Sequence, residues 1–238
     1  MGEYRIPLRL RSRRWSRALA GLVFLLPLLA GAEVGEAERF LEAWLTRQAE
    51  VKSWTADVVQ TRKLQSLVRP LESRGRVWVR PPNQFRWQLG EPPRTIAVRT
   101  ENNFLVVYPQ LGRIERYALT GDIDPAWRQV LALLELGFPS EASEFYARYE
   151  PIASEQLGNV WRFQLRPVAR AARRLIDRVH LEIAKDDFTI RATELVFPDE
   201  SVMRNDFSHH QLNVDIDDAL FAVEAAEKYP IVDVPSAD

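Results

Sequence analysis

The fold of this chain is constrained most by two neighbouring runs of alternating apolar and charged residues. Both runs lie within Gly75–Leu89. Each run has a large apolar side chain at every second position, and Pro81-Pro82-Asn83 separates the two. Because successive side chains of a strand point to opposite faces of a sheet, this spacing predicts two half-buried strands joined by a proline-rich turn. The second run then has one broad apolar face, formed by Phe85, Trp87 and Leu89.

Further short alternating segments flank this pair at regular spacing, and Pro, Gly, Asn and Asp separate them. Several short strands with turn residues between them are typical of an antiparallel barrel or sandwich. Beside the strands around Val77 and Trp87, we predict strands at residues 54–64, 95–99, 104–108, 113–118, 161–165, 179–184, 190–197 and 207–214.

Three segments have apolar residues at helical spacing, which predicts amphipathic helices at residues 36–50, 125–136 and 140–149. Asp124 can cap the second helix, and Pro125 suits its first position. Residues 166–174 contain four arginines and are predicted to form a solvated loop. The apolar stripes of the first two helices include Phe40 and Trp44, and Trp127, Val130, Leu131 and Leu134.

The N-terminus has the form of a secretory signal peptide. Six arginines precede an apolar run at residues 18–29, and Ala30-Gly31-Ala32 follows it. The run is shorter than the ~20 residues that a spanning helix needs, so a cleaved signal is favoured over a membrane anchor. We therefore expect cleavage after Ala32, export to the periplasm and one mature domain at residues 33–238.

Cleavage changes the charge of the protein. Removing six arginines and Glu3 from totals of 32 basic and 33 acidic residues leaves a net charge of −6. Such a chain is a poor partner for nucleic acid, and its overall charge also disfavours standing attachment to an anionic membrane. The chain has no cysteine, which excludes disulfides, thiolate metal sites and lipid attachment at a processed N-terminal cysteine.

The pattern of chemically active residues does not predict an enzyme, a cofactor or a metal site. His209 and His210 are adjacent, so on a strand they point to opposite faces, and His180 is expected to be an ordinary histidine of a strand. The acidic residues at 186–187 and 215–218 lack the glycine and distal glutamate of a calcium loop, so we expect a turn and a strand exit there. Phosphate-loop, zinc-protease and nucleophile-elbow motifs are absent from the sequence.

The stretch from Gly75 to Trp87 resembles the LolA family of periplasmic lipoprotein carriers. The family pattern is a glycine, a tryptophan between apolar residues, an Arg-Pro pair and Phe-x-Trp, and only the Arg-Pro pair is not kept here. The similarity extends over residues 51–60, 92–96 and 103–108, and it thins after Gly121. Pro81 replaces the family's arginine, which is thought to help latch the lid. Arg80 stands one position early, where a strand side chain points to the opposite face, so the latch role is not transferred to it.

The resemblance implies an α+β fold that is mainly β: an unclosed, curved antiparallel half-barrel with an apolar concave side and a helical lid. By spacing alone, an ordinary sheet core is the favoured interpretation of the same apolar residues, and the resemblance reverses that preference. Either face of the sheet could be concave. The cavity lining that the resemblance implies is Val77, Val79, Phe85, Trp87, Leu89, Phe104, Val106 and Tyr108. The implied lid is Phe40, Trp44, Trp127, Val130, Leu131 and Leu134.

The resemblance also implies a function. A carrier of this family takes lipoproteins from an inner-membrane release complex, shields their acyl chains and passes them to an outer-membrane acceptor. The related receptor LolB is anchored through an N-terminal cysteine, so this cysteine-free chain resembles the carrier, expected to be a monomer. Two alternatives stay open: a paralogue that carries another amphiphile, such as a glycolipid or a lipid-linked pigment, and a periplasmic scaffold.

Overall fold

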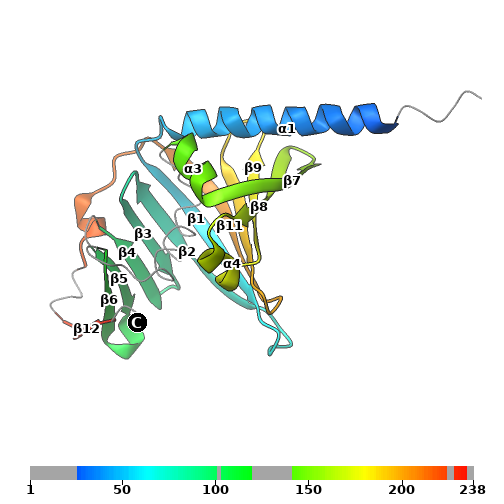
Figure 1. Cartoon of the computed structure of the whole chain (residues 1–238). Helices are drawn as coiled ribbons and strands as arrows, with labels where there is room; N and C mark the ends of the chain where they lie inside the picture. Colours follow the sequence, from blue (N-terminus) through cyan, green and yellow to red (C-terminus); the bar gives the residue numbers. More distant parts are fainter. Residues whose placement is uncertain (1–25, 101–102, 120–140, 224–227, 235–238) are drawn as a thin grey trace, which may run out of the picture.

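The protein folds around one large, strongly curved sheet (Figure 1). The computed structural model describes residues 26–100, 103–119, 141–223 and 228–234. Twelve strands lie in the order β12-β6-β5-β4-β3-β2-β1-β11-β10-β9-β8-β7. All neighbours are antiparallel except β12 and β6, and within these residues the edge strands β12 and β7 do not pair with each other. The sheet is therefore unclosed, and the predicted mainly-β half-barrel is confirmed.

The sheet consists of two antiparallel meanders, joined by the pairing of β1 with β11, and of the short strand β12 at one edge. The first meander consists of β1 (Trp54–Lys63), β2 (Leu71–Arg80), β3 (Gln84–Leu89), β4 (Thr95–Arg99), β5 (Asn103–Tyr108) and β6 (Arg113–Ala118). The second consists of β7 (Tyr149–Leu157), β8 (Val160–Pro167), β9 (Arg178–Ala184), β10 (Ile190–Val196) and β11 (Val202–Leu212). The described helices are α1 (Leu26–Gln48), α3 (Ala142–Arg148) and α4 (Arg170–Leu175), with short 3₁₀ turns η1 (Pro109–Leu111) and η2 (Asp218–Phe221). Strand β12 is Ile231–Asp233.

Gly75 allows β2 and β3 to approach closely. It pairs with Leu89, and a Cβ atom at position 75 would lie 1.8 Å from the carbonyl oxygen of Gln88. No other residue fits this position without a backbone shift. The glycine of the sequence pattern is thus explained by packing of the sheet.

One face of the sheet, called the inner face here, carries a continuous apolar cluster that we name the inner-face cluster. Alternate residues of both meanders contribute to it, and α1 packs against it, because alternation brings every second side chain to the same face. Burial of each large apolar side chain contributes roughly 1.5–3 kcal/mol to stability. Its buried members include Leu41, Trp44, Leu45, Trp54, Val77, Val79, Phe85, Trp87, Phe104, Val106, Tyr117, Phe145, Trp161, Phe163, Leu165, Val179, Leu181, Ile183 and Phe207.

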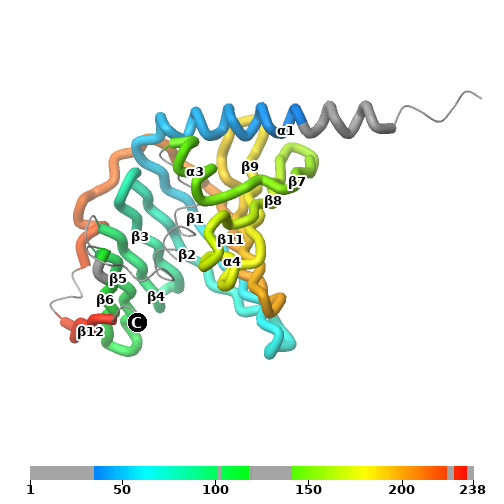
Figure 2. The backbone as a smooth tube through the Cα atoms, viewed as in Figure 1, coloured from blue at the N-terminus to red at the C-terminus, as the bar shows by residue number. Residues whose placement is uncertain are grey.

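The outer face of the first meander carries a second, smaller set of buried apolar residues, which includes Val98, Val107 and Ile114. The C-terminal segment passes along the outside of β3 to β6 (Figures 1 and 2). The backbone N–H of Ile114 donates a hydrogen bond to the Pro230 carbonyl, at 3.1 Å, and η2 lies against β3. The ambiguity between Phe104/Val106 and Leu105/Val107 is thereby resolved, because Phe104 and Val106 face the inner cluster.

Several predicted element boundaries were wrong. Strands β7 and β12 have no counterpart among the predicted strands, and part of the predicted loop at residues 166–174 forms the helix α4. Helix α1 begins at Leu26 rather than at residue 36, and β11 begins at Val202 rather than at residue 207. The helix predicted at 125–136, with Trp127, Val130, Leu131 and Leu134, lies outside the described residues. None of the described helices combines the length and apolar character needed to cross a membrane.

A candidate apolar ligand site on the inner face

The structure brings the residues expected to line a cavity onto one face. Six of them, Val77, Val79, Phe85, Trp87, Phe104 and Val106, are buried there, and Leu89 and Tyr108 are partly buried against the same cluster. Strand register explains the grouping, since Val79 pairs with Phe85 and Val77 pairs with Trp87. The proline-rich turn between β2 and β3 therefore sets the two apolar runs directly opposite each other.

Aromatic rings extend this face across the sheet. The Phe85 and Phe104 ring centroids are 5.9 Å apart, and Phe104 lies 5.8 Å from Tyr117. On the other side, Trp87 contacts Phe207 edge to face at 5.8 Å. Such pairs favour offset and edge-on geometries at these separations, so the rings form a broad, rigid apolar surface.

Helix α1 covers the second meander rather than the Phe85–Trp87 strand. It lies across the top of Figure 1, over β7, β8 and β9. Phe40 stacks on Phe188 at 5.0 Å and on Phe163 at 6.4 Å, and the fully buried Trp44 contacts Phe145 at 6.2 Å. The two predicted lid residues of α1 thus pack against the part of the inner-face cluster formed by β8, by α3 and by the segment after β9.

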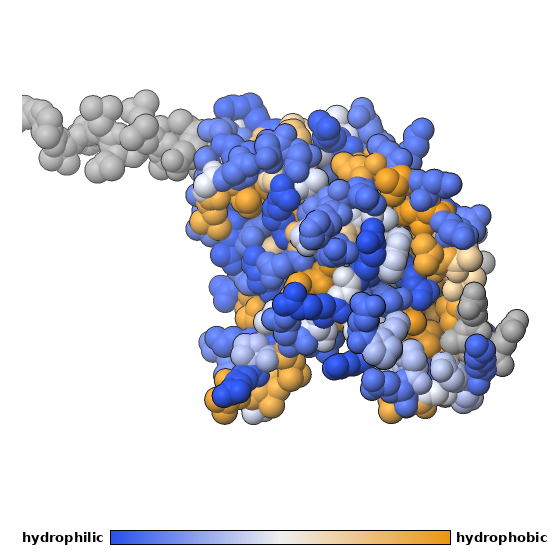
Figure 3. Space-filling view, turned by 180° about the vertical axis from the view of Figure 1, so that it is seen from behind, coloured by the Kyte–Doolittle hydropathy of each residue, from blue (hydrophilic) through white to orange (hydrophobic). Residues whose placement is uncertain are grey.

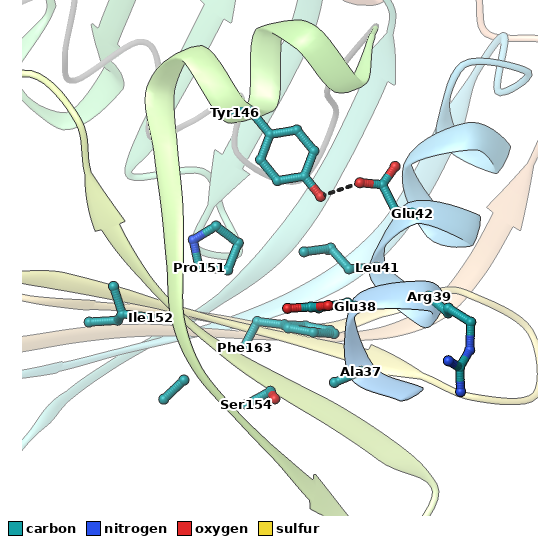
Figure 4. Close-up of a pocket in the computed structure, with 11 residues that line it drawn as sticks. Ala37, Glu38, Arg39, Leu41, Glu42, Tyr146, Pro151, Ile152, Ser154 and Phe163 are labelled. Carbon is teal, nitrogen blue, oxygen red and sulfur yellow. Dashed lines mark hydrogen bonds between the residues drawn. The ribbon is translucent and has the colours of Figure 1, made fainter. Parts of the chain in front are cut away.

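A groove of about 920 Å³ separates α1 from β7, and we call it the α1–β7 groove. Its walls come from α1, α3 and β7 (Figure 4). Three of its lining residues, Ala37, Leu41 and Phe163, belong to the inner-face cluster, so the floor of the groove continues into that cluster. The groove was missed in the sequence because β7 was not predicted. The remaining lining residues are Glu38, Arg39, Glu42, Tyr146, Pro151, Ile152, Ala153 and Ser154.

One hydrogen bond joins two walls of this groove. The Tyr146 hydroxyl of α3 donates to the Glu42 carboxylate of α1 at 2.7 Å (Figure 4). Burial, together with the bond to Glu42, raises the pKa of Tyr146 above its ordinary value. The neutral hydroxyl, which can donate this bond, is therefore the favoured form.

Three indole N–H groups in the inner-face cluster lack a hydrogen-bond acceptor among the described residues: those of Trp44, Trp87 and Trp161. Their side chains are nearly or fully buried. A buried donor without an acceptor is costly in a native protein, and so each of these groups needs an explanation. All three could donate to a carbonyl oxygen brought by a ligand.

A polar cluster borders the apolar face on β5 and β6. Glu115 accepts hydrogen bonds from the hydroxyls of Tyr117, at 3.0 Å, and Tyr108, at 3.3 Å, and from Arg113 at 2.5 Å. Burial first, and Glu115 second, raise the pKa of both tyrosines. The carboxylate is thus held by donors of its own strand pair, and the apolar face ends there.

Arg80 lies on the outer face. Its guanidinium donates to Asp218 Oδ1 at 2.5 Å and to the Ile216 carbonyl at 2.5 Å, and it lies 4.9 Å from the Phe221 ring centroid. These contacts attach the C-terminal segment to β2. On the inner face, the arginine closest in sequence to the Pro81-Pro82 turn is Arg99. Its guanidinium donates a hydrogen bond to the Pro82 carbonyl at 3.4 Å.

Polar networks fill the outer face of the second meander. Glu194 accepts from Arg162 at 2.9 Å and contacts His180 Nδ1 at 2.7 Å, so His180 is a satisfied strand histidine as predicted. His209 and His210 have different partners, Asp57 and the Ile190 carbonyl. Within the described ranges, no three His, Asp or Glu side chains are grouped in a way that could hold a metal ion.

A family model described as "Outer membrane lipoprotein carrier protein LolA" matches residues 49–224. An outer-membrane lipoprotein carrier protein of Chromohalobacter salexigens is 27% identical over 229 residues, covering 94% of this chain and 98% of that protein.

Solved structures also resemble this chain. An uncharacterized conserved protein from Thermus thermophilus has a TM-score of 0.50 at 13% identity, covering 84% of this chain and 99% of the other. A LolA superfamily protein from Nitrosomonas europaea has a TM-score of 0.39 at 14% identity, covering 77% and 97%. The family match covers more than half of the chain and includes all the strands from β1 to β11.

Proposed function

The chain belongs to the LolA family of outer membrane lipoprotein carrier proteins, and we propose that it shields the acyl chains of lipoproteins on its inner face and carries them across the periplasm. The family is one of carriers and not of enzymes. The observation that carries the proposal is the continuity between the α1–β7 groove and the inner-face cluster, through Ala37, Leu41 and Phe163.

The energetics of acyl burial suit a carrier in which part of the protein must move aside before the acyl chain can enter. At roughly 0.8 kcal/mol per buried methylene, a long acyl chain supplies more than about 10 kcal/mol. A rigid, well-fitted pocket would retain such a ligand too tightly for delivery. If α1 must move to admit the chain, part of the burial energy is spent on that movement, and release stays feasible. The bond between Tyr146 and Glu42 is one interaction that this movement would break.

The unpaired indole donors fit an acylated ligand better than a plain hydrocarbon. Acyl groups reach the glycerol of a lipoprotein through ester bonds, and an ester carbonyl accepts a hydrogen bond. The N–H groups of Trp44, Trp87 and Trp161 have no acceptor among the described residues. A carbonyl oxygen placed near one of them would satisfy a buried donor and add directional affinity to the apolar contact.

We further propose that the signal peptide is cleaved after Ala32, so that the mature protein begins at Glu33 in the periplasm. Its partners would be an inner-membrane release complex and an outer-membrane acceptor. N-terminal sequencing of protein released by osmotic shock tests the location. Membrane-bound protein that keeps residues 1–32 would contradict it.

One observation favours a second candidate, a family member that carries a different amphiphile. The family's latch arginine is replaced by Pro81, and the neighbouring Arg80 binds the C-terminal segment on the outer face. A changed latch is consistent with a cargo of different bulk, such as a glycolipid or a lipid-linked pigment. A scaffold that only docks a partner protein is a third possibility, and it requires no lipid at all.

Mass spectrometry of organic extracts separates these candidates. The protein is purified from the periplasm without detergent, and the extract is compared with that of an unrelated periplasmic protein. Co-purified lipoprotein or lipopeptide supports lipoprotein carriage, and another amphiphile supports the second candidate. A clean extract from folded protein that also takes up no acyl probe would contradict both carriers and leave the scaffold.

A further inference from the structure

The connection between β1 and β2 exposes a compact set of large apolar side chains. Leu67 is 42%, Val68 102% and Leu71 51% exposed, all within five positions. Single exposed apolar residues are common on protein surfaces, but three together at the end of a hairpin are not explained by chance exposure. We call residues 64–71 the hairpin tip.

The hairpin tip projects from the rest of the sheet. In Figures 1 and 2 it forms the low end of the molecule, beyond the turn between β10 and β11. Figure 3 shows apolar residues gathered on the corresponding projection at the lower left. A turn orders the tip, since the Leu67 N–H donates to the Leu64 carbonyl at 3.1 Å. The apolar side chains are therefore held outward on a defined protrusion.

The charges around the tip are mixed with a small positive excess. Lys63 and Arg69 are exposed, and neither forms an ion pair within the part of the chain that the structure describes. Glu72 is paired with Arg74 at 2.9 Å. On the neighbouring turn, Asp199 accepts hydrogen bonds from Ser201, and Glu200 is exposed.

We propose that the hairpin tip inserts Leu67, Val68 and Leu71 into the interface of a phospholipid bilayer. Apolar side chains rimmed by Lys and Arg suit the boundary between acyl chains and anionic headgroups. A bilayer fits this narrow protrusion better than a protein does, because stable protein interfaces need a much larger, complementary surface on both sides. The net charge of −6 disfavours permanent attachment of the protein to an anionic membrane, so the contact is transient. The hairpin tip makes this contact locally, although the overall charge of the protein is negative.

The hairpin tip would be the surface with which a carrier meets the membrane. The inference rests on the proposed function only for the reason why the protein docks there. In Figure 1 the tip lies at the opposite end of the molecule from α1 and α3, which form walls of the α1–β7 groove. Substitutions at one are therefore expected to leave the other intact. Membrane docking and acyl binding can be measured separately.

The absence of cysteine makes a direct test available. In the mature protein, Val68→Cys is labelled with an environment-sensitive fluorophore, and vesicles of phosphatidylethanolamine and phosphatidylglycerol are added. We expect a blue shift and a several-fold rise in emission, and a smaller response with phosphatidylcholine vesicles. Leu157→Cys, at an exposed apolar residue next to the β7–β8 turn, is the matched control and should not respond.

Co-flotation of unlabelled protein with the same vesicles gives the strength of the contact. The double variant Leu67→Ser/Val68→Ser should partition at least about tenfold more weakly than wild type, because two large apolar side chains no longer enter the bilayer. The matched control is Leu157→Ser/Val168→Ser, which removes two exposed apolar residues elsewhere and should float like wild type. Lys63→Gln/Arg69→Gln should weaken binding only on anionic vesicles.

The outcomes distinguish this inference from the proposed function. Loss of flotation in the tip variant, with unchanged binding of a fluorescent fatty acid in vesicle-free solution, supports the inference. Wild type that does not float, or a tip variant that floats equally well, overturns it. A tip variant that floats normally but loses a protein partner or self-association also overturns it. Wild type that floats but binds no fatty acid contradicts the proposed function alone.

Discussion

The hydroxyl of Tyr146 lies 2.7 Å from the carboxylate of Glu42, and this bond joins α3 to α1 across the rim of the α1–β7 groove. The two residues are 104 positions apart in sequence. Beneath them, the groove leads to Leu41 and Phe163 of the inner-face cluster. Any widening of the groove by movement of α1 away from α3 breaks this bond, so the pair is placed to influence how readily the site opens.

We therefore predict that Tyr146→Phe speeds exchange of an acyl ligand. The substitution keeps the ring but removes one hydrogen bond to a charged group, which should cost about 1–2 kcal/mol of stability. The rate of fluorescent fatty-acid release should rise several-fold in stopped-flow measurements. Glu42→Gln is the control, since an amide oxygen still accepts the bond, and it should change the release rate less. A Tyr146→Phe protein with wild-type exchange would show that α1 does not gate the site.

The alternation of apolar and polar residues made most of the sheet predictable. The strands that it did not predict were missed for a physical reason. Strands β4 and β6 were predicted with their observed bounds, because in each strand the side chains on one face differ in kind from those on the other. Strand β7 was missed because it is an edge strand, exposed over most of its length and interrupted at Pro151. An edge strand buries little, so it has no apolar pattern to detect. The groove beside it was missed for the same reason.

The residues of the inner face were predictable as one set from the alternation, but which face of the sheet they occupy was not. Phe104 and Val106 alternate with Leu105 and Val107, which are equally apolar. The outer set is covered by a C-terminal segment more than 100 positions away, and local pattern contains no information about that contact. The displaced Arg80 was different, because its one-position shift alone predicted that it would leave the inner face.

Trp87→Phe tests whether an inner-face indole recognises a carbonyl. Removal of an unpaired N–H should weaken binding of an acyl ester by about fivefold, the equivalent of one ordinary hydrogen bond. Binding of an alkane-chain probe without a carbonyl should change less. Trp78→Phe is the control, because Trp78 lies on the opposite face of β2 near Arg76. Equal losses for ester and alkane ligands would leave the indole N–H without a role in recognition.

Arg80→Ala should loosen the C-terminal segment without affecting the inner face. The substitution removes contacts to Asp218, the Ile216 carbonyl and the Phe221 ring. We expect a loss of about 1–3 kcal/mol, measured by urea unfolding, and faster hydrogen exchange at residues 216–221. Fatty-acid binding should stay at the wild-type level. A strong fatty-acid-binding defect in folded Arg80→Ala protein would indicate that Arg80 does help to latch the lid.

Acid should destabilise the protein partly through Glu194. Its hydrogen bond with His180, and the charges of Arg162 and Arg204, lower the pKa of Glu194 below its ordinary value, against the opposing effect of burial. Because the folded state binds this proton less readily than the unfolded state, the stabilisation is complete above the ordinary glutamate pKa. It is lost as pH falls through the folded-state value.

Glu194→Gln should therefore be less stable than wild type at pH 7, and its stability should fall less steeply below about pH 4.5. Urea unfolding at several pH values between about 3 and 7 measures both effects. Glu72→Gln, which alters an exposed ion pair with Arg74, is the control for loss of one carboxylate. Parallel pH profiles of wild type and Glu194→Gln would remove this carboxylate from the acid response.

Phe85→Glu distinguishes a ligand-binding face from a closed core. Phe85 is 4% exposed, pairs with Val79 and contacts Phe104. In a closed core the new carboxylate would be buried without a partner, which costs several kcal/mol and unfolds a marginally stable domain. On a face that opens to admit acyl chains, water can reach the charge when no ligand is bound.

We expect the carrier outcome: Phe85→Glu protein that stays folded by circular dichroism but no longer binds a fluorescent fatty acid. Arg86→Glu, one position along on the outer face, is the matched control, and it should keep fatty-acid binding even where it weakens the contact with the Leu220 carbonyl. Phe85→Ala removes the ring without adding a charge and should only weaken binding. Folded Phe85→Glu protein with normal fatty-acid binding would exclude this part of the inner face from the site, because a carboxylate and an acyl chain cannot occupy the same apolar surface.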